Sequence, residues 1–252
     1  MPDKTTGLMR QQLLDIGLPP GYAWAEWVRH AGVEAANNRL ALWLVHGGRL
    51  WLTSDVPAGK THLSHMLAGE HPQLGLLRVQ TASSESSTRL VAAWLEELGN
   101  AAWWLIDVPA GPIRRATAIA LFHLLERGRE MQRPIALAWR IEDAGELPPE
   151  LVTRLATLER VEMRPPHSDA ELTVVLHAVA ASRQWHVDDA VIRLMLTYLP
   201  RDLDGLIAAM GQMEKASLAE RKRLTARWAS RQIRDLGDDL AASRQSSLFS
   251  GD

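Results

Sequence analysis

The sequence predicts an α/β protein in which a parallel sheet flanked by helices is followed by a small all-helical domain. Short apolar runs alternate with helix-like segments in the first two thirds of the chain, as expected of a doubly wound sheet. After Arg164-Pro165-Pro166 every segment reads as helical. Ser168-Asp169-Ala170-Glu171 has the pattern of a capping box, which marks a helix start.

The expected elements follow in chain order. Helices are expected over 31–44, 60–68, 89–98, 116–129 and 151–158, and strands over 49–53, 76–80, 101–107, 135–139 and 160–163. The helical part is expected to contain helices over 168–183, 188–198, 201–217 and 225–234. These elements divide the chain into a flexible arm (1–21), an α/β nucleotide-binding domain (22–165), a helical lid (166–236) and a disordered tail (237–252).

Composition narrows the class of protein. The 252 residues suit one large domain with a small appendage, and a net charge of −2 argues against a protein that coats nucleic acid. Without cysteine there is no disulfide, thiol chemistry or cysteine-based zinc site. The chain has no signal-peptide pattern and no apolar run of about 18 residues, so we expect a cytoplasmic protein without a membrane partner.

A phosphate-binding loop lies between the first strand and the next helix. Residues 54–61 match G-x-x-x-x-G-K-[ST] except at the first glycine, which is Ser54. Backbone N–H groups at the helix start would surround the phosphates of ADP or ATP, with Lys60 on the β-phosphate and Thr61 on Mg²⁺. The residues expected to bind nucleotide here are Pro57, Ala58, Gly59, Lys60, Thr61 and His62.

Asp107 ends the apolar strand at 101–107, where a carboxylate would coordinate Mg²⁺ together with Thr61. In an active ATPase a second acid normally follows and orients the attacking water. Here Val108 and Pro109 follow, and neither accepts a proton. We therefore expect bound nucleotide with weak or absent intrinsic hydrolysis.

These motifs together resemble the AAA+ module of the DnaA family, over roughly residues 10–235. The resemblance rests on Gly59-Lys60-Thr61-His62-Leu63, the strand ending at Asp107, Leu151-Val152-Thr153-Arg154-Leu155, Pro165-Pro166-His167-Ser168-Asp169, Leu199-Pro200-Arg201-Asp202-Leu203, Ala216-Ser217-Leu218 and Lys222-Arg223-Leu224-Thr225. Length and gaps are most similar to the Hda branch, the regulatory inactivators of DnaA. Because few residues follow Arg234, we expect this chain to lack the helix-turn-helix domain with which DnaA reads DNA.

The resemblance assigns roles to two arginines. It makes Arg201 the sensor-2 arginine, which reaches the nucleotide of its own chain. It makes Arg154 the arginine finger, which completes the site of a neighbouring subunit; a permanently charged, planar guanidinium suits both tasks. Sensor 1 departs from the family pattern, because Trp139 stands where a small polar residue is expected. Ser54, Val108 and Trp139 thus all weaken hydrolysis in cis.

The resemblance further implies a function and its partners. The chain would promote hydrolysis of DnaA-bound ATP and so act as a negative regulator of replication initiation, near the nucleoid and replisome. The tail resembles the Q-x-x-L-F peptide that docks on the bacterial sliding clamp (the polymerase beta subunit), through Gln245, Leu248 and Phe249. A secondary candidate peptide comprises Gln11, Leu14 and Ile16. DNA would be contacted only through the clamp, and homo-oligomers are left open.

Two alternatives stay open at this point. One is an autonomous AAA+ ATPase of the helicase-loader type, which remodels a replication protein. The other is an adaptor with a vestigial nucleotide site that bridges the clamp to another partner. The residues after Asp107 count against the first, and the retained Lys60, Thr61 and Arg201 count against the second.

Overall fold

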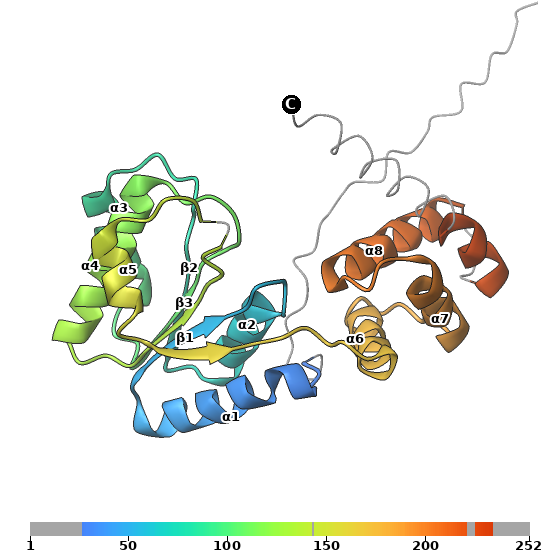
Figure 1. Cartoon of the computed structure of the whole chain (residues 1–252), viewed down its shortest axis with the longest axis horizontal. Coiled ribbons are helices and arrows are strands. Elements are labelled where there is room, and N and C mark those ends of the chain that lie inside the picture. The colour runs from blue at the N-terminus through green and yellow to red at the C-terminus, as the bar shows by residue number, and fades with distance from the viewer. Residues whose placement is uncertain (1–26, 143, 221–224, 234–252) are drawn as a thin grey trace, which may run out of the picture.

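The computed structural model describes residues 27–142, 144–220 and 225–233. An α/β domain comes first and a helical domain follows (Figure 1). The strands are β1 (Arg49–Thr53), β2 (Leu74–Arg78), β3 (Trp103–Asp107), β4 (Ile135–Ala138) and β5 (Glu159–Glu162). The helices of this domain are α1 (Ala31–His46), α2 (Lys60–Glu70), α3 (Ser87–Leu98), α4 (Arg115–Glu130) and α5 (Pro149–Leu155).

The five strands are parallel and pair in the order β2-β3-β4-β1-β5. β1 lies inside the sheet, with Leu52 opposite Ala138 of β4 and Val161 of β5. Because the strands run in one direction, their carboxyl ends meet at one edge, where open parallel sheets bind ligands. The loop after β1 and the residue that ends β3 therefore share this edge.

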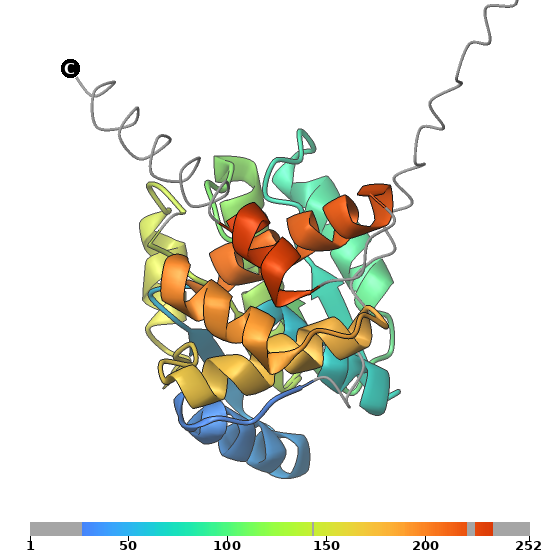
Figure 2. The ribbon, with the colours of Figure 1, turned by 90° about the vertical axis from the view of Figure 1, so that its right-hand side faces the viewer.

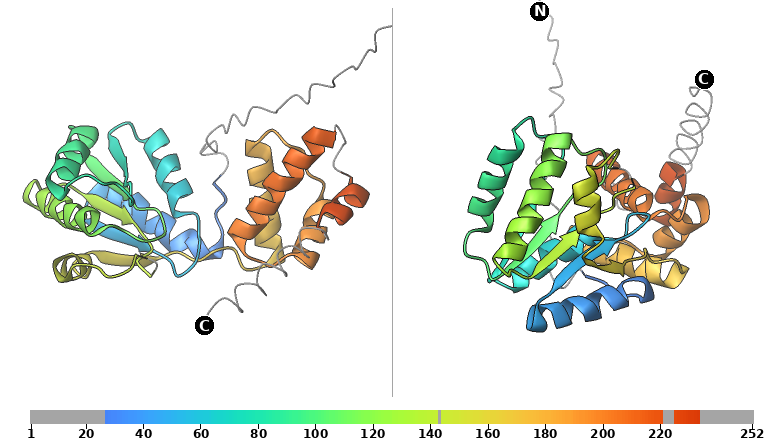
Figure 3. Two further views of the ribbon diagram at one scale, coloured as in Figure 1. Left: turned by 90° about the horizontal axis from the view of Figure 1, so that it is seen from above. Right: turned by 60° about the vertical axis from the view of Figure 1, so that its left-hand side comes forward.

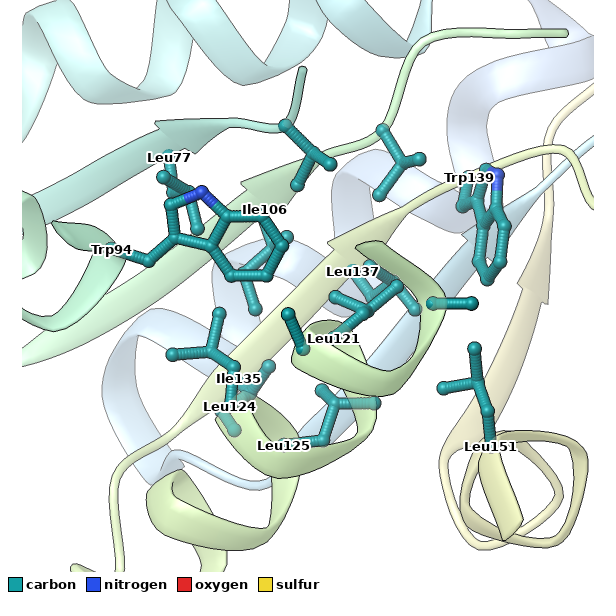
Figure 4. Close-up of a cluster of buried hydrophobic side chains, with 14 of the residues drawn as sticks. Leu77, Trp94, Ile106, Leu121, Leu124, Leu125, Ile135, Leu137, Trp139 and Leu151 are labelled. Atoms are coloured by element: carbon teal, nitrogen blue, oxygen red, sulfur yellow. The ribbon is translucent and has the colours of Figure 1, made fainter. Parts of the chain in front are cut away.

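Helices cover both faces of the sheet (Figure 3). α3, α4 and α5 pack on one face, and α1 and α2 pack on the other. Side chains alternate along β4: Leu137 and Trp139 enter the core under α4 and α5, whereas Ala136 and Ala138 face α1 and α2. Figure 4 shows Trp139 in the same core as Leu151 of α5.

β2 begins two residues earlier than predicted, at Leu74. Leu74 is buried and pairs with Trp103 of β3. The next residue is Gly75, where a Cβ would lie 2.8 Å from the Ala101 Cβ. A glycine inside a strand weakens its sequence signal, and here close packing requires it. The predicted fold class is confirmed, with this shift of one strand.

The helical domain consists of α6 (Asp169–Ser182), α7 (Asp189–Tyr198), α8 (Leu203–Glu220) and helical residues 226–233. It has its own apolar core, and Figure 2 shows it in front of the carboxyl edge of the sheet. The core includes Leu176, Val191, Met195, Leu206, Met210 and Trp228.

The predicted capping box is present at the start of α6. The Glu171 backbone N–H donates to Ser168 Oγ at 3.2 Å, and the Glu171 carboxylate accepts from the Ser168 N–H at 3.3 Å. The same carboxylate accepts from the backbone N–H groups of His167 and of Ala31, the first residue of α1. These bonds, with that from His167 the strongest, lower the pKa of Glu171 to about 2. Glu171 thus links the helical domain to the α/β domain.

The two candidate clamp-binding peptides, Gln11 to Ile16 and Gln245 to Phe249, lie outside the described residues. Within the ranges that the structure describes, no helix is long and apolar enough to cross a membrane.

Candidate functional site

The loop after β1 ends in a glycine with left-handed backbone geometry. Gly59 has φ +79° and immediately precedes α2. A Cβ at this position would lie 3.2 Å from the Trp27 ring, so both the backbone angle and the contact favour glycine. In the described part of the chain no side chain caps the start of α2. Its first N–H groups therefore face a place suited to an anion.

Ser54, which stands in place of the first glycine of the motif, contacts Lys60 of the same loop. It is fully buried, and its Oγ accepts a hydrogen bond from the Lys60 ammonium. Burial, and after it the positive charge of Arg140, lowers the pKa of Lys60 to about 8. Ser54 thus holds the lysine inside its own loop, an arrangement that the motif comparison did not reveal.

Thr61 and Asp107 meet at the carboxyl edge, as the sequence predicts. Thr61 Oγ1 donates to Asp107 Oδ1 at 3.0 Å, and burial raises the pKa of the Asp107 carboxyl. The second carboxylate oxygen, Oδ2, is buried and accepts no hydrogen bond from the described residues. A hydroxyl beside a carboxylate with one unused oxygen is a donor set that fits Mg²⁺ with bound waters.

The positions that would complete a hydrolytic site are apolar and buried. Val108, directly after Asp107, is 3% exposed. Trp139 is fully buried in the core beneath α4 and α5 (Figure 4), and its backbone oxygen accepts from Trp51 Nε1 at 3.2 Å. Neither side chain can orient a water over the loop.

A cavity of about 300 Å³ lies between the loop and the helical domain. Its volume is at the lower end of the range for small-molecule sites. Trp27 borders it and meets the His62 ring edge-on, with ring centroids 5.5 Å apart. Of the predicted nucleotide-binding residues, Ala58, Gly59 and His62 line the cavity. Its other lining residues are Trp27, Val28, His30, Pro166, Val175, Val179, Ser182, Arg183, Leu203, Asp204 and Ile207.

A larger depression of about 860 Å³ lies on the helical domain beside His177 and Trp185. Its lining includes the carboxylates of Asp188 and Asp189 but no lysine or arginine. That charge would repel phosphate, so the smaller cavity beside the loop is the better nucleotide site.

Arg201, the predicted sensor-2 residue, pairs with an acidic residue of its own domain. Its side chain is 58% exposed and forms a bidentate pair with Asp169, at 2.9 and 3.2 Å. Arg201 does not line the cavity, whereas Asp204, three residues further along the chain, does. Its role as a phosphate ligand stays a prediction that requires the Asp169 pair to open.

Arg154, the predicted finger, lies on α5 and pairs with Glu126 of α4. Glu126 also accepts from Arg129 at 3.1 Å. α4 returns the chain to the amino end of β4, and α5 leads into the amino end of β5. Both partners therefore lie toward the amino edge, across the strands from the loop. A five-residue strand spans about 16 Å, so Arg154 cannot reach the phosphates at its own loop.

Sequence reasoning missed two charged residues at the carboxyl edge. Arg140 follows Trp139 after β4, and Asp204 lies near the start of α8. Both interact electrostatically with Lys60. Strand alternation could have placed Arg140 on the loop side, because it is two residues beyond Ala138. No pattern in the sequence indicates the position of Asp204.

Solved structures with similar folds are AAA+ proteins. Domain III of the Thermotoga maritima replication initiation protein DnaA matches with a TM-score of 0.65 and 15% identity, over 87% of this chain and 98% of that one. AMPPCP-bound DnaA from Aquifex aeolicus matches with a TM-score of 0.55 and 16% identity, over 80% and 67%. The Thermotoga maritima RuvB Holliday junction branch migration motor gives 0.58 and 16%, over 83% and 70%.

The helical domain also matches a family model directly. Residues 169–228 match the model described as "Hda, lid domain". The match spans α6, α7, α8 and the start of the helical segment at 226–233. The whole chain thus has the fold of these DnaA and RuvB structures, and its helical domain is similar to the lid domain of Hda.

Proposed function

We propose that this chain regulates replication initiation by promoting hydrolysis of ATP bound to DnaA. It holds ADP or ATP in its own site without efficient turnover. It supplies Arg154 in trans as the arginine finger, and it is tethered to the sliding clamp by the peptide at Gln245, Leu248 and Phe249. It acts in the cytoplasm, at the replisome, and contacts DNA only through the clamp.

The observation that carries this proposal is the separation of Arg154 from Lys60. Lys60 lies at the carboxyl edge of the sheet with the loop, and Arg154 lies toward the amino edge with Glu126. A guanidinium in that place does not reach the chain's own nucleotide, which supports a role on a nucleotide held by another subunit. An arginine supplied in trans accelerates related NTPases by about 10³- to 10⁵-fold.

Nucleotide binding in cis is supported by the loop and the cavity beside it. The uncapped start of α2, the Lys60 ammonium and the cavity lined by Trp27 form a site for phosphates and a flat ring. Thr61 and Asp107 would hold Mg²⁺, which would supply charge neutralisation next to the phosphates. Two of the matching DnaA structures were determined with AMPPCP bound.

Weak turnover in cis is supported by the residues around the loop. Val108 and Trp139 fill the water-orienting positions with buried apolar side chains. This favours a regulator over the alternative of an autonomous ATPase of the helicase-loader type. The intact pair of Thr61 and Asp107 favours it over an adaptor with a vestigial site.

The test is turnover of DnaA-bound ATP in the presence of clamp loaded on DNA. Arg154→Ala should reduce the stimulated rate to that of DnaA alone, while Arg154→Lys should restore little, since lysine lacks the planar fork. Arg89→Ala is the matched control, because Arg89 is an exposed arginine on α3 of the same domain. Full stimulation by Arg154→Ala would rule out the proposed mechanism.

The tether needs its own test, because the peptide lies outside the described residues. A pull-down with the clamp should lose binding in the double variant Leu248→Ala/Phe249→Ala. Retained binding would move the tether to Gln11, Leu14 and Ile16, or remove it from the proposal.

A further inference from the structure

Arg140 occupies a defined place at the carboxyl edge of the sheet. The Trp139 N–H donates to Leu52 O at 3.0 Å, so the β4–β1 ladder continues one residue past β4. Trp139 enters the core under α4 and α5, while Ala138 faces α2. Alternation puts Arg140 on the α2 side, next to the loop that follows β1.

Charged side chains from both domains surround Lys60. Of the charged groups that act on Lys60, Arg140 acts most strongly, and Asp204 of α8 acts in the opposite sense. Asp204 in turn interacts with both Lys60 and Arg140, while burial and the nearby Asp202 raise the pKa of the Asp204 carboxyl. Asp107 and Glu142 of the α/β domain act on Lys60 in the same sense as Asp204 and more strongly, so Asp204 is the carboxylate that the lid adds to this cluster of charges.

The cavity of about 300 Å³ lies between the loop and Asp204. Ala58 and Gly59 of the loop line it from one side, and Asp204 lines it from the other. Arg201, the arginine that the family resemblance selects, is absent from its lining and paired with Asp169. Arg140 does not line the cavity either, but of these two arginines it is the one that lies on the loop side of the sheet and interacts with Lys60.

We propose that Arg140 is a second cationic ligand of the nucleotide phosphates in this chain, and that Asp204 competes with those phosphates for Lys60 and Arg140. This inference rests on the proposed nucleotide site and names residues that set its affinity. Without nucleotide, the lid carboxylate adds to the acidic groups that offset the two clustered positive charges. When nucleotide binds, its phosphates neutralise the charges of Lys60 and Arg140. The phosphates also repel the Asp204 carboxylate, and this repulsion opposes binding.

The two residues should therefore have opposite effects on affinity. Arg140→Gln removes a charge-assisted contact and should weaken ADP and ATP binding by about 10- to 100-fold. Arg140→Lys keeps the charge and should weaken binding less. Asp204→Asn removes the competing charge and should tighten binding by about three- to tenfold.

The experiment is isothermal titration calorimetry of the full chain with ADP and with ATP, each in Mg²⁺. Thermal melting of each variant checks that it folds, and Asp204→Asn tests the inference independently should Arg140→Gln be unstable. Wild-type affinity in Arg140→Gln, or weakened binding in Asp204→Asn, overturns the corresponding half of the inference.

Lys60→Ala separates failure of this inference from failure of the proposed function. Should wild type bind neither nucleotide, the proposed site and this inference fall together. Should wild type bind, Lys60→Ala not bind and Arg140→Gln bind normally, only the inference falls.

Discussion

The carboxyl edge of the sheet and the α4–α5 surface near its amino edge both carry arginine and acid, but in different arrangements. At the carboxyl edge, Lys60 and Arg140 share a region with Asp107 and Asp204 beside a glycine loop and a cavity. At the α4–α5 surface, Arg154 pairs with Glu126, each with about one fifth of its side chain exposed (22% and 21%).

This difference suggests one task for each region: the carboxyl edge suits binding of the chain's own nucleotide, and the α4–α5 surface suits action on a partner's nucleotide. Clustered cations beside uncapped helix N–H groups are an arrangement that holds a phosphate chain. A single, partly exposed guanidinium oriented by a carboxylate is an arrangement that can present its remaining N–H groups to another subunit's phosphate. The two regions thus serve two different nucleotides in the function that we propose.

The largest expected effect on the carboxyl edge comes from Lys60. Lys60→Ala should weaken ADP binding by about 100-fold, because it removes a charge-assisted contact to phosphate. Calorimetry measures this, and Lys215→Ala on α8 is the matched control. Equal affinity in both variants would mean that the loop does not hold phosphate.

Removal of the metal-binding carboxylate should have the next largest effect. Asp107→Asn should reduce affinity for ATP by about tenfold in Mg²⁺, since the amide binds the cation more weakly than the carboxylate. In EDTA the variant and the wild type should bind alike. Asp55→Asn, an exposed residue of the same loop, serves as control. A difference that persists in EDTA would assign Asp107 a structural role instead.

Glu126 tests the α4–α5 surface as a positioning residue for Arg154. Glu126→Gln should lower the maximal stimulated rate by about three- to tenfold through loss of the ion pair that orients the guanidinium. The concentration needed for half-maximal stimulation, and ADP affinity, should stay unchanged. Glu126→Asp should restore part of the rate. A shift in half-maximal concentration alone would assign Glu126 to partner docking.

The smallest expected effect is on thermal stability and comes from Glu171, which links the two domains. Glu171 has a pKa of about 2 in the folded chain, below its ordinary value of 4.5, so its stabilisation is present above pH 4.5 and is lost as pH falls toward 2. Glu171→Gln should lower Tm by a few degrees at pH 7 and by progressively less in acid. Thermal melting from pH 7 to pH 3 checks this, with Glu70→Gln as control. A constant difference would exclude the charge as the cause.

Much of this contrast could be predicted from the sequence. The glycine loop, the strand ending in Asp107 and the capping box at Ser168 each have a local pattern with a physical cause. The apolar residues at Val108 and Trp139 also indicated a weak hydrolytic site before the fold was known. Local patterns thus predicted the loop's backbone and the proximity of Thr61 to Asp107.

The rest depends on contacts between distant segments. The bond from Lys60 to Ser54, the pairing of Arg201 with Asp169 and the approach of Asp204 to the loop each depend on how the domains pack. In the sequence, Ser54 is only a departure from the glycine of the motif. The strand order β2-β3-β4-β1-β5, which places Arg154 across the sheet from Lys60, has no signature in a single sequence either.

The most direct test of two separate regions follows both nucleotides in one reaction. DnaA carrying radiolabelled ATP is mixed with clamp-loaded DNA and with this chain carrying a fluorescent ADP analogue. Arg154→Ala should keep its own fluorescent nucleotide with wild-type affinity and leave the labelled ATP unhydrolysed. Loss of the chain's own nucleotide in Arg154→Ala, or normal hydrolysis of the partner's ATP, would contradict the account.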